Sequence, residues 1–192
     1  MLDLGGVLAD LGDPVEAMGL EMGSGRFWEI WLSSPSVRAY ESGEPRTAGF
    51  AREMAPELGL ESAAAFESRF ERWQLKPYPA AEGLVRSIPQ DVRVCLLSNT
   101  NEVHWQQILS RTTIFDQFDH LFLSFQTGHY KPQESAYMQV VEHYQCSPGN
   151  ILFLDDSDSN VRAASALGLR ATRVDGPEGA ENALKMAGLL AG

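Results

Sequence analysis

Short polar stretches follow apolar runs at several points along this chain, and their residue types are those of a reactive site. The residues concerned are Asp3, Ser98, Asn99, Lys131, Asp155, Asp156 and Asn160. An aspartate can act as a nucleophile, while a hydroxyl and an ammonium group can hold an anion. Two adjacent carboxylates at the end of a buried strand repel each other, and a hard cation such as Mg2+ offsets that repulsion. Together these groups are the parts needed to hold and cleave a phosphate monoester.

Taken singly, each stretch has an ordinary structural explanation. Ser98 and Asn99 can cap the helix that follows them, and Lys131 can be a solvated loop lysine. The negative charges of Asp155 and Asp156 can interact favourably with the dipole of the helix that follows them. Short motifs arise readily by chance, so the hypothesis of a site depends on the whole set rather than on any one member.

Continuous apolar runs in the second half of the chain predict buried strands. They span residues 94–97, 121–123 and 151–154, and they lack the polar alternation of a half-exposed strand. Residues 171–174 alternate, as an edge strand does, and helical patterns separate the runs. Strands that alternate with helices predict an α/β fold with a Rossmann-like parallel sheet. Ligands bind at the carboxyl ends of such strands, which is where the polar stretches lie.

Residues 13–79 have a different pattern, with no apolar run of the strand type. Phe27 and Trp31 have helical spacing, and prolines interrupt the segment. We therefore predict a small all-helical insertion at 13–79, placed after the first strand of a core formed by residues 1–12 and 80–192. Its aromatic residues are expected to form the interior of the helical bundle.

The overall charge limits the range of partners. The formal net charge is −11 at pH 7, and so acidic a surface repels nucleic acid and anionic membranes. No apolar run approaches membrane-spanning length, and Cys95 and Cys146 are expected to be reduced structural residues. These features predict a cytoplasmic protein and leave the oligomeric state open. A small phosphorylated metabolite is predicted as the partner by the reactive residues above, which can hold and cleave a phosphate monoester.

The order of the polar stretches resembles that of the haloacid dehalogenase superfamily, and the resemblance covers nearly all of the chain. The stretches that carry it are Asp3–Leu8, Leu97–Asn101, Lys131–Pro132 and Asp155–Asn160. The helical insertion lies between the first and the second, in the place of that family's cap domain, and it is called the cap below. The motif residues are especially similar to those of the bacterial branch that includes α-glucose-1-phosphate phosphatases.

The resemblance implies a nucleophile and a magnesium site. Asp3 would attack phosphorus and become an aspartyl phosphate, which water then hydrolyses. Asp3 would also bind Mg2+ together with the Gly5 backbone carbonyl and Asp156. Asp155 would either be a further ligand or contact the ligands without binding the ion itself. The implied activity is that of a magnesium-dependent phosphatase.

The resemblance also implies how the phosphate is held. Ser98 and the backbone amide of Asn99 would contact phosphate oxygens. Lys131 would neutralise charge on both Asp3 and the phosphate, and Asn160 would position Lys131. Substrate choice is expected to lie in the cap, where Arg38, Tyr40, Glu41 and Arg46 are candidates. A solvated charge on a helix is the favoured alternative explanation for any one of them.

Gly5 stands where many phosphatases of this family have a second aspartate, which protonates the leaving group. General acid catalysis typically contributes about 10²–10⁴-fold to the rate. Another group, such as Asp10 or a cap residue, can supply the proton, the leaving group can need little help, or the enzyme can be slow. If the leaving group needs little help, α-glucose 1-phosphate, p-nitrophenyl phosphate or acetyl phosphate is hydrolysed faster than glucose 6-phosphate.

The first strand is short. Only Met1 and Leu2 precede Asp3, whereas strands usually run about five or six residues. In the family that the chain resembles, the strand before the nucleophile lies in the middle of the sheet. We therefore expect the natural chain to begin a few residues upstream.

Two other interpretations fit parts of the pattern. In a dehalogenase of the same superfamily the aspartate attacks carbon and halide leaves without a proton, so the absence of an acid at Gly5 is no handicap. That enzyme needs no metal, however, and the pair Asp155 and Asp156 then has no purpose. A non-catalytic protein that binds a phosphorylated metabolite would also tolerate the loss of the acid.

Overall fold

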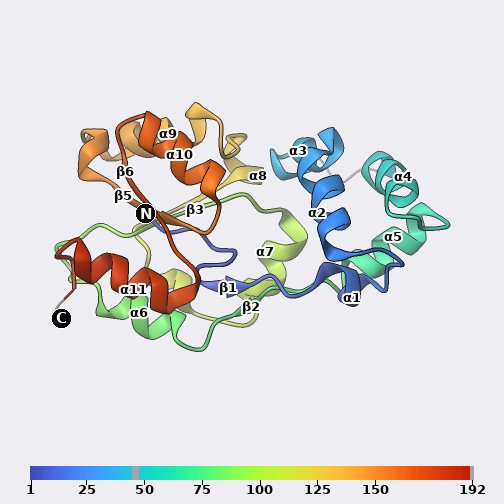
Figure 1. The fold of residues 1–192 in the computed structure, drawn as a ribbon, viewed down its shortest axis with the longest axis horizontal. Helices are drawn as coiled ribbons and strands as arrows, with labels where there is room; N and C mark the ends of the chain where they lie inside the picture. The colour runs from blue at the N-terminus through green and yellow to red at the C-terminus, as the bar shows by residue number, and fades with distance from the viewer. Residues whose placement is uncertain (45–47, 191–192) are drawn as a thin grey trace.

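The chain folds into an α/β core and a helical cap, which lie side by side (Figure 1). The computed structural model describes residues 1–44 and 48–190. The helices of the cap are α1 (Pro14–Met18), α2 (Ser24–Ser33), α3 (Pro35–Glu41), α4 (Ala48–Glu57) and α5 (Ala63–Phe70). The strands of the core are β3 (Cys95–Ser98), β4 (His120–Leu123), β5 (Leu152–Asp155) and β6 (Arg170–Arg173). Its helical elements are α6 (Ala81–Ser87), α7 (Glu102–Leu109), η1 (Ile114–Gln117), α8 (Ser124–Thr127), α9 (Glu134–Tyr144), η2 (Pro148–Asn150), α10 (Asp158–Ala166) and α11 (Gly176–Met186).

The core is built on a parallel sheet in which the start of the chain lies between two strand pairs. β3 pairs with β4 and β5 with β6, all in parallel, and Leu2 bridges Leu96 of β3 and Leu154 of β5. The Leu2 amide donates to the Cys95 carbonyl at 2.9 Å, and the Asp3 amide donates to the Leu154 carbonyl at 2.9 Å. The spatial order is therefore β4, β3, Leu2, β5 and β6, which puts Asp3 at the middle of the sheet, at the carboxyl ends of the strands.

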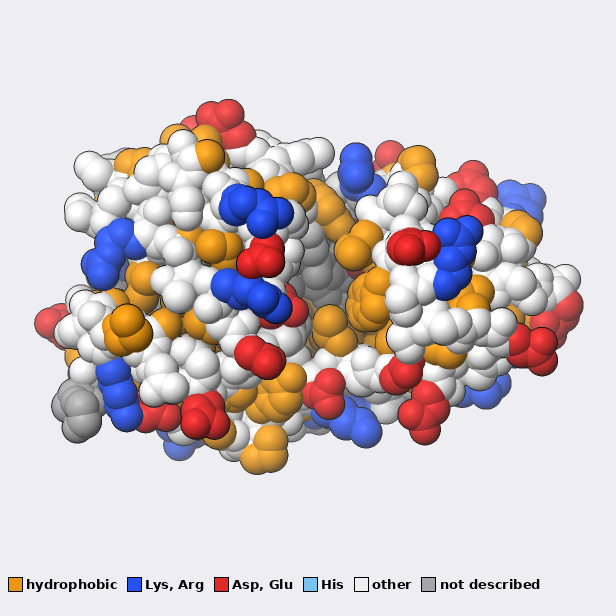
Figure 2. Space-filling view, in the orientation of Figure 1, with side chains coloured by type: hydrophobic (Ala, Val, Ile, Leu, Met, Phe, Trp, Pro, Cys, Tyr) orange, Lys and Arg blue, Asp and Glu red, His pale blue; other side chains and the backbone are white. Residues whose placement is uncertain are grey.

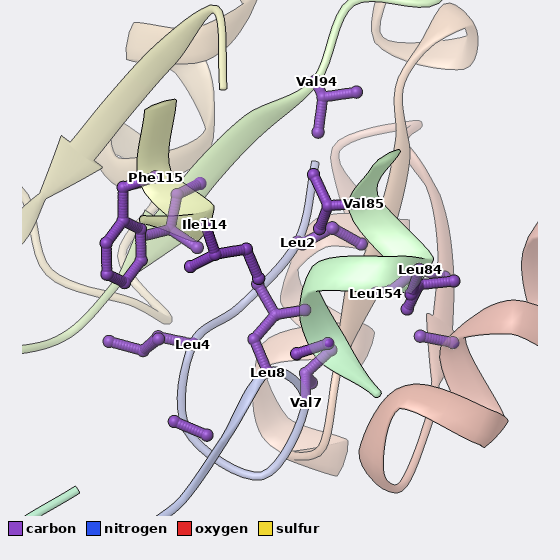
Figure 3. Packing of buried hydrophobic residues seen from close by; sticks show 14 of the residues in the cluster. Leu2, Leu4, Val7, Leu8, Leu84, Val85, Val94, Ile114, Phe115 and Leu154 are labelled. Carbon is purple, nitrogen blue, oxygen red and sulfur yellow. The ribbon is translucent and has the colours of Figure 1, made fainter. Parts of the chain in front are cut away.

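Helices cover both faces of this sheet, which explains why the predicted strands are apolar throughout. Successive residues of β3 point to opposite faces. Leu96 belongs to a cluster with residues of α6 and α11, whereas Leu97 belongs to a cluster with residues of α9 and α10. Figure 3 shows the first cluster, in which Leu2 lies near Val85 of α6. β6 is largely exposed, as its alternating sequence predicts for an edge strand.

The cap has an apolar interior of its own. Phe27, Trp31, Phe70 and Trp73 are buried in it, and the ring centroids of Trp31 and Trp73 lie 5.1 Å apart. The predicted role of these aromatic residues as the interior of a helical bundle is confirmed. The boundaries at 13 and 79 stay a prediction, and the structure adds an antiparallel ribbon of β1 (Ala9–Asp10) and β2 (Lys76–Pro77) that joins cap and core. In the described part of the chain, no helix has the length and apolarity needed to cross a membrane.

Candidate active site

The predicted site residues come from several elements that end at the same edge of the sheet. Asp3 follows the bridging residue Leu2, Ser98 is the last residue of β3, and Asp155 is the last residue of β5. Lys131 lies in the loop between α8 and α9. Because parallel strands end at one edge, residues that are far apart in the sequence become neighbours there.

Lys131 is at the centre of the site. Its ammonium nitrogen Nζ lies 2.8 Å from Oδ1 of Asp3 and 2.6 Å from Oδ2 of Asp155. Burial by itself would lower the pKa of Lys131, but the charges of Asp3 and Asp155 outweigh burial and raise this pKa above its ordinary value. The buried lysine is therefore a cation at neutral pH, and it stabilises the carboxylates on either side of it.

Asn99 fixes the loop that carries Lys131. Nδ2 of Asn99 donates to the Lys131 carbonyl, and the Lys131 amide donates to Oδ1 of Asn99, both at 2.8 Å. The family resemblance implied only a backbone contact between Asn99 and phosphate, so this side-chain role was missed. The bonds join residues whose separation in the sequence is too long for any local pattern to reveal them.

Asp155 is fully buried, and several donors hold its carboxylate. It accepts hydrogen bonds from Nζ of Lys131 at 2.6 Å and from the Ser157 amide at 2.8 Å. Nδ2 of Asn160 donates to both carboxylate oxygens, at 3.0 and 3.1 Å. Asn160 was predicted to position Lys131, but its amide contacts Asp155 instead, so its influence on the lysine passes through that carboxylate.

Asp3, Asp155 and Asp156 form a cluster suited to a divalent cation. One carboxylate oxygen from each lies within 4.8 Å of the others. Burial raises the pKa of Asp3 to about 7 against the opposing charge of Lys131, and burial also raises the pKa of Asp156. One ammonium group cannot neutralise all of these carboxylates. A hard divalent cation such as Mg2+ fits both the oxygen ligands and the excess of negative charge.

Gly6 allows Asp156 to reach this cluster. Its φ is +69°, and a β-carbon on Gly6 would lie 2.3 Å from Oδ2 of Asp156. Only glycine combines that backbone conformation with so close an approach. No role was predicted for Gly6. The pair Gly5 and Gly6 directly after Asp3 was the available signal, because adjacent glycines mark a tight turn.

A cavity of about 600 Å³ lies between the edge of the sheet and the cap, and Figure 2 shows the surface hollowed between the two parts. Its core wall includes Asp3, Gly5, Asn99, Lys131, Asp156 and Asn160. Its cap wall includes Trp28, Trp31, Leu32, Arg38, Glu41 and Trp73. A larger cavity of about 730 Å³ lies beside Met1 and Cys95, but none of the predicted site residues lines it. The smaller cavity is therefore the one that can present a substrate to Asp3.

Ser98 is less directly placed than the other predicted residues. It is buried, its hydroxyl group donates to the Asn99 carbonyl at 3.5 Å, and it is not among the residues that line the cavity. Its contact with a phosphate oxygen stays a prediction. Asp10, an alternative source of the leaving-group proton, is exposed, does not line the cavity, and accepts a hydrogen bond from the Gly12 amide at 2.8 Å.

The predicted substrate-selecting residues of the cap divide into different groups. Arg38 and Glu41 line the cavity. Tyr40 is buried inside the cap, where its ring centroid lies 4.5 Å from that of Phe50. Arg46 lies outside the described residues.

Tryptophans have a second role that the sequence did not reveal. Trp31 and Trp73 belong to the cap interior, and together with Trp28 they also form part of the cavity wall. Helical spacing shows which residues share a face, but it does not show which edge of a buried ring faces a neighbouring domain. This wall can contact the apolar part of a substrate and exclude water from the reaction.

Comparison with known proteins assigns the family. The sequence model of the haloacid dehalogenase-like hydrolases matches residues 2–168, and the chain therefore belongs to this family of hydrolases. The predicted α/β fold is confirmed by structural neighbours of the same family. A predicted hydrolase of this type from Porphyromonas gingivalis has a TM-score of 0.75 and 24% sequence identity, over 97% of this chain and 95% of that chain. A family enzyme of Bacteroides thetaiotaomicron, solved with magnesium and inorganic phosphate, has a TM-score of 0.70 and 24% identity, over 91% of this chain and 92% of that chain.

Curated relatives include both dehalogenases and phosphatases. Haloacetate dehalogenase H-2 of Moraxella sp. (strain B) is 28% identical over 112 residues, which are 58% of this chain and 50% of that protein. Sesquiterpene phosphatase astK of Aspergillus oryzae is 28% identical over 142 residues, which are 72% of this chain and 71% of that protein. D-ribitol-5-phosphate phosphatase of Bacteroides thetaiotaomicron is 30% identical over 90 residues, which are 44% of each. The chain thus spans about half the length of the first and third relatives.

Proposed function

We propose that this hydrolase is a magnesium-dependent phosphatase of small phosphate monoesters, with Asp3 as its nucleophile. The observation that carries the proposal is the placement of Asp3 in one cluster with Asp155 and Asp156, 2.8 Å from the buried ammonium group of Lys131. Such a cluster can hold a metal ion and a phosphate group beside the same carboxylate. The phosphatases among the relatives support the proposal.

The acid cluster fits Mg2+ through its hard oxygen ligands. Asp3, Asp156 and the Gly5 carbonyl are the ligands that we propose. The Asp155 carboxylate is already engaged in hydrogen bonds, so we propose that it stabilises the site without binding the ion directly. When bound, the ion neutralises charge on the carboxylates and on the phosphate. The Bacteroides thetaiotaomicron enzyme that was solved with magnesium and inorganic phosphate supports this choice of cofactor.

The residues of the chain then divide the reaction between them. Asp3 attacks phosphorus and forms an aspartyl phosphate, which water hydrolyses. Lys131 neutralises charge on Asp3 and on the phosphate, and Ser98 and the Asn99 amide hold the phosphate oxygens. Asn160 donates a hydrogen bond that keeps the Asp155 carboxylate in place within the cluster.

A phosphatase screen with and without magnesium tests this function. The wild type should hydrolyse phosphate monoesters only with Mg2+, and Asp3→Asn should lower kcat by about 10⁴-fold or more, because the nucleophile is lost. Asp10→Asn is the matched control, since Asp10 is exposed and outside the cavity, and it should keep its activity. Turnover that needs no metal, or that survives in Asp3→Asn, would rule the mechanism out.

A sugar phosphate is the substrate class that we propose. Arg38 and Glu41 offer polar groups to hydroxyls, the tryptophans of the cap wall offer ring faces, and one relative is a D-ribitol-5-phosphate phosphatase. If the leaving group needs little help, kcat/KM should be higher for α-glucose 1-phosphate, p-nitrophenyl phosphate and acetyl phosphate than for glucose 6-phosphate. Equal or reversed values would contradict this leaving-group hypothesis.

Dehalogenation is the second candidate function. Haloacetate dehalogenase H-2 is a relative. The chain has glycine in place of the general acid at position 5, and a departing halide ion needs no proton. The cluster of Asp3, Asp155 and Asp156 argues against it, because a reaction without metal leaves this excess of negative charge without a purpose. Release of chloride from 2-chloropropionate in the presence of EDTA would favour dehalogenation, whereas binding of Mg2+ and phosphate without turnover would indicate a binding protein.

A further inference from the structure

A buried carboxyl group on the cap wall has no part in the reaction described so far. Glu41 is the last residue of α3, is 7% exposed, and lines the same cavity as Asp3. Glutamate is almost never buried unless it has a partner or a function. The role inferred below for Glu41 rests on the proposed phosphatase function.

The position that carries the acid in related phosphatases is a glycine in this chain and has no side chain to donate a proton. Gly5 stands two residues after Asp3, and a β-carbon on Gly5 would lie 2.9 Å from Cδ2 of Leu11. Leu11 also lines the cavity, so an apolar side chain occupies the space beside the nucleophile. A proton for the leaving group therefore has to come from another part of the wall.

Glu41 is the group best able to donate a proton among the described residues that line the cavity. Apart from the acid cluster and Lys131, the other titratable groups there are Arg38, His104 and Tyr130. Arginine stays protonated in proteins. Burial lowers the pKa of His104 to about 3 and raises the pKa of Tyr130 above its ordinary value, so neither gives up a proton readily at neutral pH. Burial raises the pKa of Glu41 to about 7, which is close to the best value for a general acid.

We propose that Glu41 is the general acid that protonates the leaving oxygen of the phosphate ester. As an oxygen of Asp3 bonds to phosphorus, the bond from phosphorus to the leaving oxygen breaks and its electron pair stays on that oxygen. The proton of Glu41 passes to this oxygen, which departs as an alcohol. Water then attacks the aspartyl phosphate, which releases inorganic phosphate and a proton to the solvent and restores the Asp3 carboxylate. The Glu41 carboxylate takes up a proton from the solvent, so both residues return to their first state.

A purely structural role for Glu41 is the alternative to exclude. Besides Trp31 of the cap, its carboxyl group has the core side chains of Tyr130 and Asn101 as polar neighbours. A residue in this place can hold the cap against the core. Loss of that docking would slow every substrate alike, whereas loss of an acid slows a substrate in proportion to how much its leaving group needs a proton.

Phenyl phosphate and p-nitrophenyl phosphate make this distinction, because they have similar shapes and differ in leaving-group basicity. With Mg2+ present, Glu41→Gln should lower kcat about 10²-fold for phenyl phosphate and less than about threefold for p-nitrophenyl phosphate. Wild-type kcat for phenyl phosphate should fall as the pH rises above about 7, and Glu41→Gln should lack that decline. Glu41→Asp keeps a carboxyl group and should recover part of the loss. Glu57→Gln, an exposed change on α4, is the matched control and should behave as the wild type.

The possible outcomes distinguish a failure of the general-acid role of Glu41 from a failure of the proposed phosphatase function. Equal losses on both substrates, or no loss on phenyl phosphate, would overturn the role of Glu41 and leave the phosphatase function intact. A wild type that fails to hydrolyse p-nitrophenyl phosphate with Mg2+ would overturn the function itself. A thermal melt shows whether Glu41→Gln folds. If it does not, Glu41→Asp carries the test, because a displaced acid lowers kcat more for phenyl phosphate than for p-nitrophenyl phosphate.

Discussion

The core wall and the cap wall of the cavity hold their side chains by different means. On the core wall, ion pairs and hydrogen bonds fix individual atoms, as in the contacts of Lys131 with Asp3 and Asp155. On the cap wall, Trp31 and Trp73 are held by the packing of aromatic rings. Directional bonds set the positions of reacting atoms, whereas packing sets a shape and excludes water. We infer that the core wall holds the groups that act on the phosphate itself. The cap wall acts on the rest of the substrate, which it selects and, through Glu41, supplies with a proton for the leaving oxygen.

This difference has a measurable consequence. A substitution on the core wall should change the rate for every substrate by a similar factor, because all substrates present the same phosphate group. A substitution on the cap wall should change the rates unequally, because substrates differ in the part that faces the cap. A core-wall substitution that changes the rates unequally, or a cap-wall substitution that changes them all alike, would contradict this division of roles.

The largest effect is expected when the ammonium group at the centre of the core wall is removed. Lys131→Met keeps most of the apolar stem but leaves Asp3 and Asp155 buried without their cation. Breaking a buried ion pair in this way typically costs about 3–5 kcal/mol of unfolding free energy. Urea denaturation in metal-free buffer near pH 8 measures this loss, and turnover should disappear for every substrate.

Lys185→Met is the matched control for that measurement. Lys185 pairs with Glu181 at 2.8 Å on the surface of α11, in an i,i+4 pair of the kind that contributes about 0.2–0.5 kcal/mol. If the two variants lose the same stability, the ion pairs of Lys131 do not organise the core wall.

A smaller and uniform effect is expected from Asn160, which touches no reacting group in the proposed mechanism. Asn160→Ala removes the hydrogen bonds at 3.0 and 3.1 Å that hold the Asp155 carboxylate. Loss of such an outer partner typically weakens metal affinity or activity by about 10–100-fold. The Mg2+ concentration for half-maximal activity should rise by that factor on every substrate, while the exposed Asn182→Ala should leave it unchanged. A change confined to one substrate would place Asn160 in substrate recognition instead.

The sequence predicted the core wall better than the cap wall, for a physical reason. Asp3 and Asp155 stand directly at strand ends, and the rules of parallel sheets then bring them to one edge. Continuous apolar runs predicted β3, β4 and β5 because burial on both faces leaves no room for polar alternation. What was missed on this wall, such as the paired bonds between Asn99 and Lys131, depends on contacts between distant segments.

The cap wall offered no comparable local signal. Helical spacing predicted that Trp31 is buried, but its second role beside the cavity depends on how the cap docks on the core. Glu41 illustrates the same limit, since a lone glutamate in a helical segment is usually a solvated charge. Only its burial and its place in the cavity of Asp3 distinguish it from the exposed carboxylates of the cap.

A change in how stability depends on pH is also expected, and it tests the cap wall in the metal-free protein. Burial raises the pKa of Glu41 from 4.5 to about 7, so within this window the native state keeps a proton that the unfolded state releases. The unfolding free energy of the wild type should therefore fall as the pH rises through the window. Glu41→Gln has no such group, and its stability relative to the wild type should increase by roughly 1–3 kcal/mol between about pH 5 and about pH 8.

Urea denaturation between about pH 5 and about pH 8 measures the difference in unfolding free energy between Glu41→Gln and the wild type. Titratable groups that both proteins share contribute equally to the two values and cancel in this difference. The exposed Glu57→Gln should run parallel to the wild type. If Glu41→Gln also runs parallel, the carboxyl group is ionised in the native state, and neighbours such as Tyr130 and Asn101 hold it by directional bonds. The cap wall would then fix a charge in the same way as the core wall does, and the contrast between the two walls would not hold at Glu41.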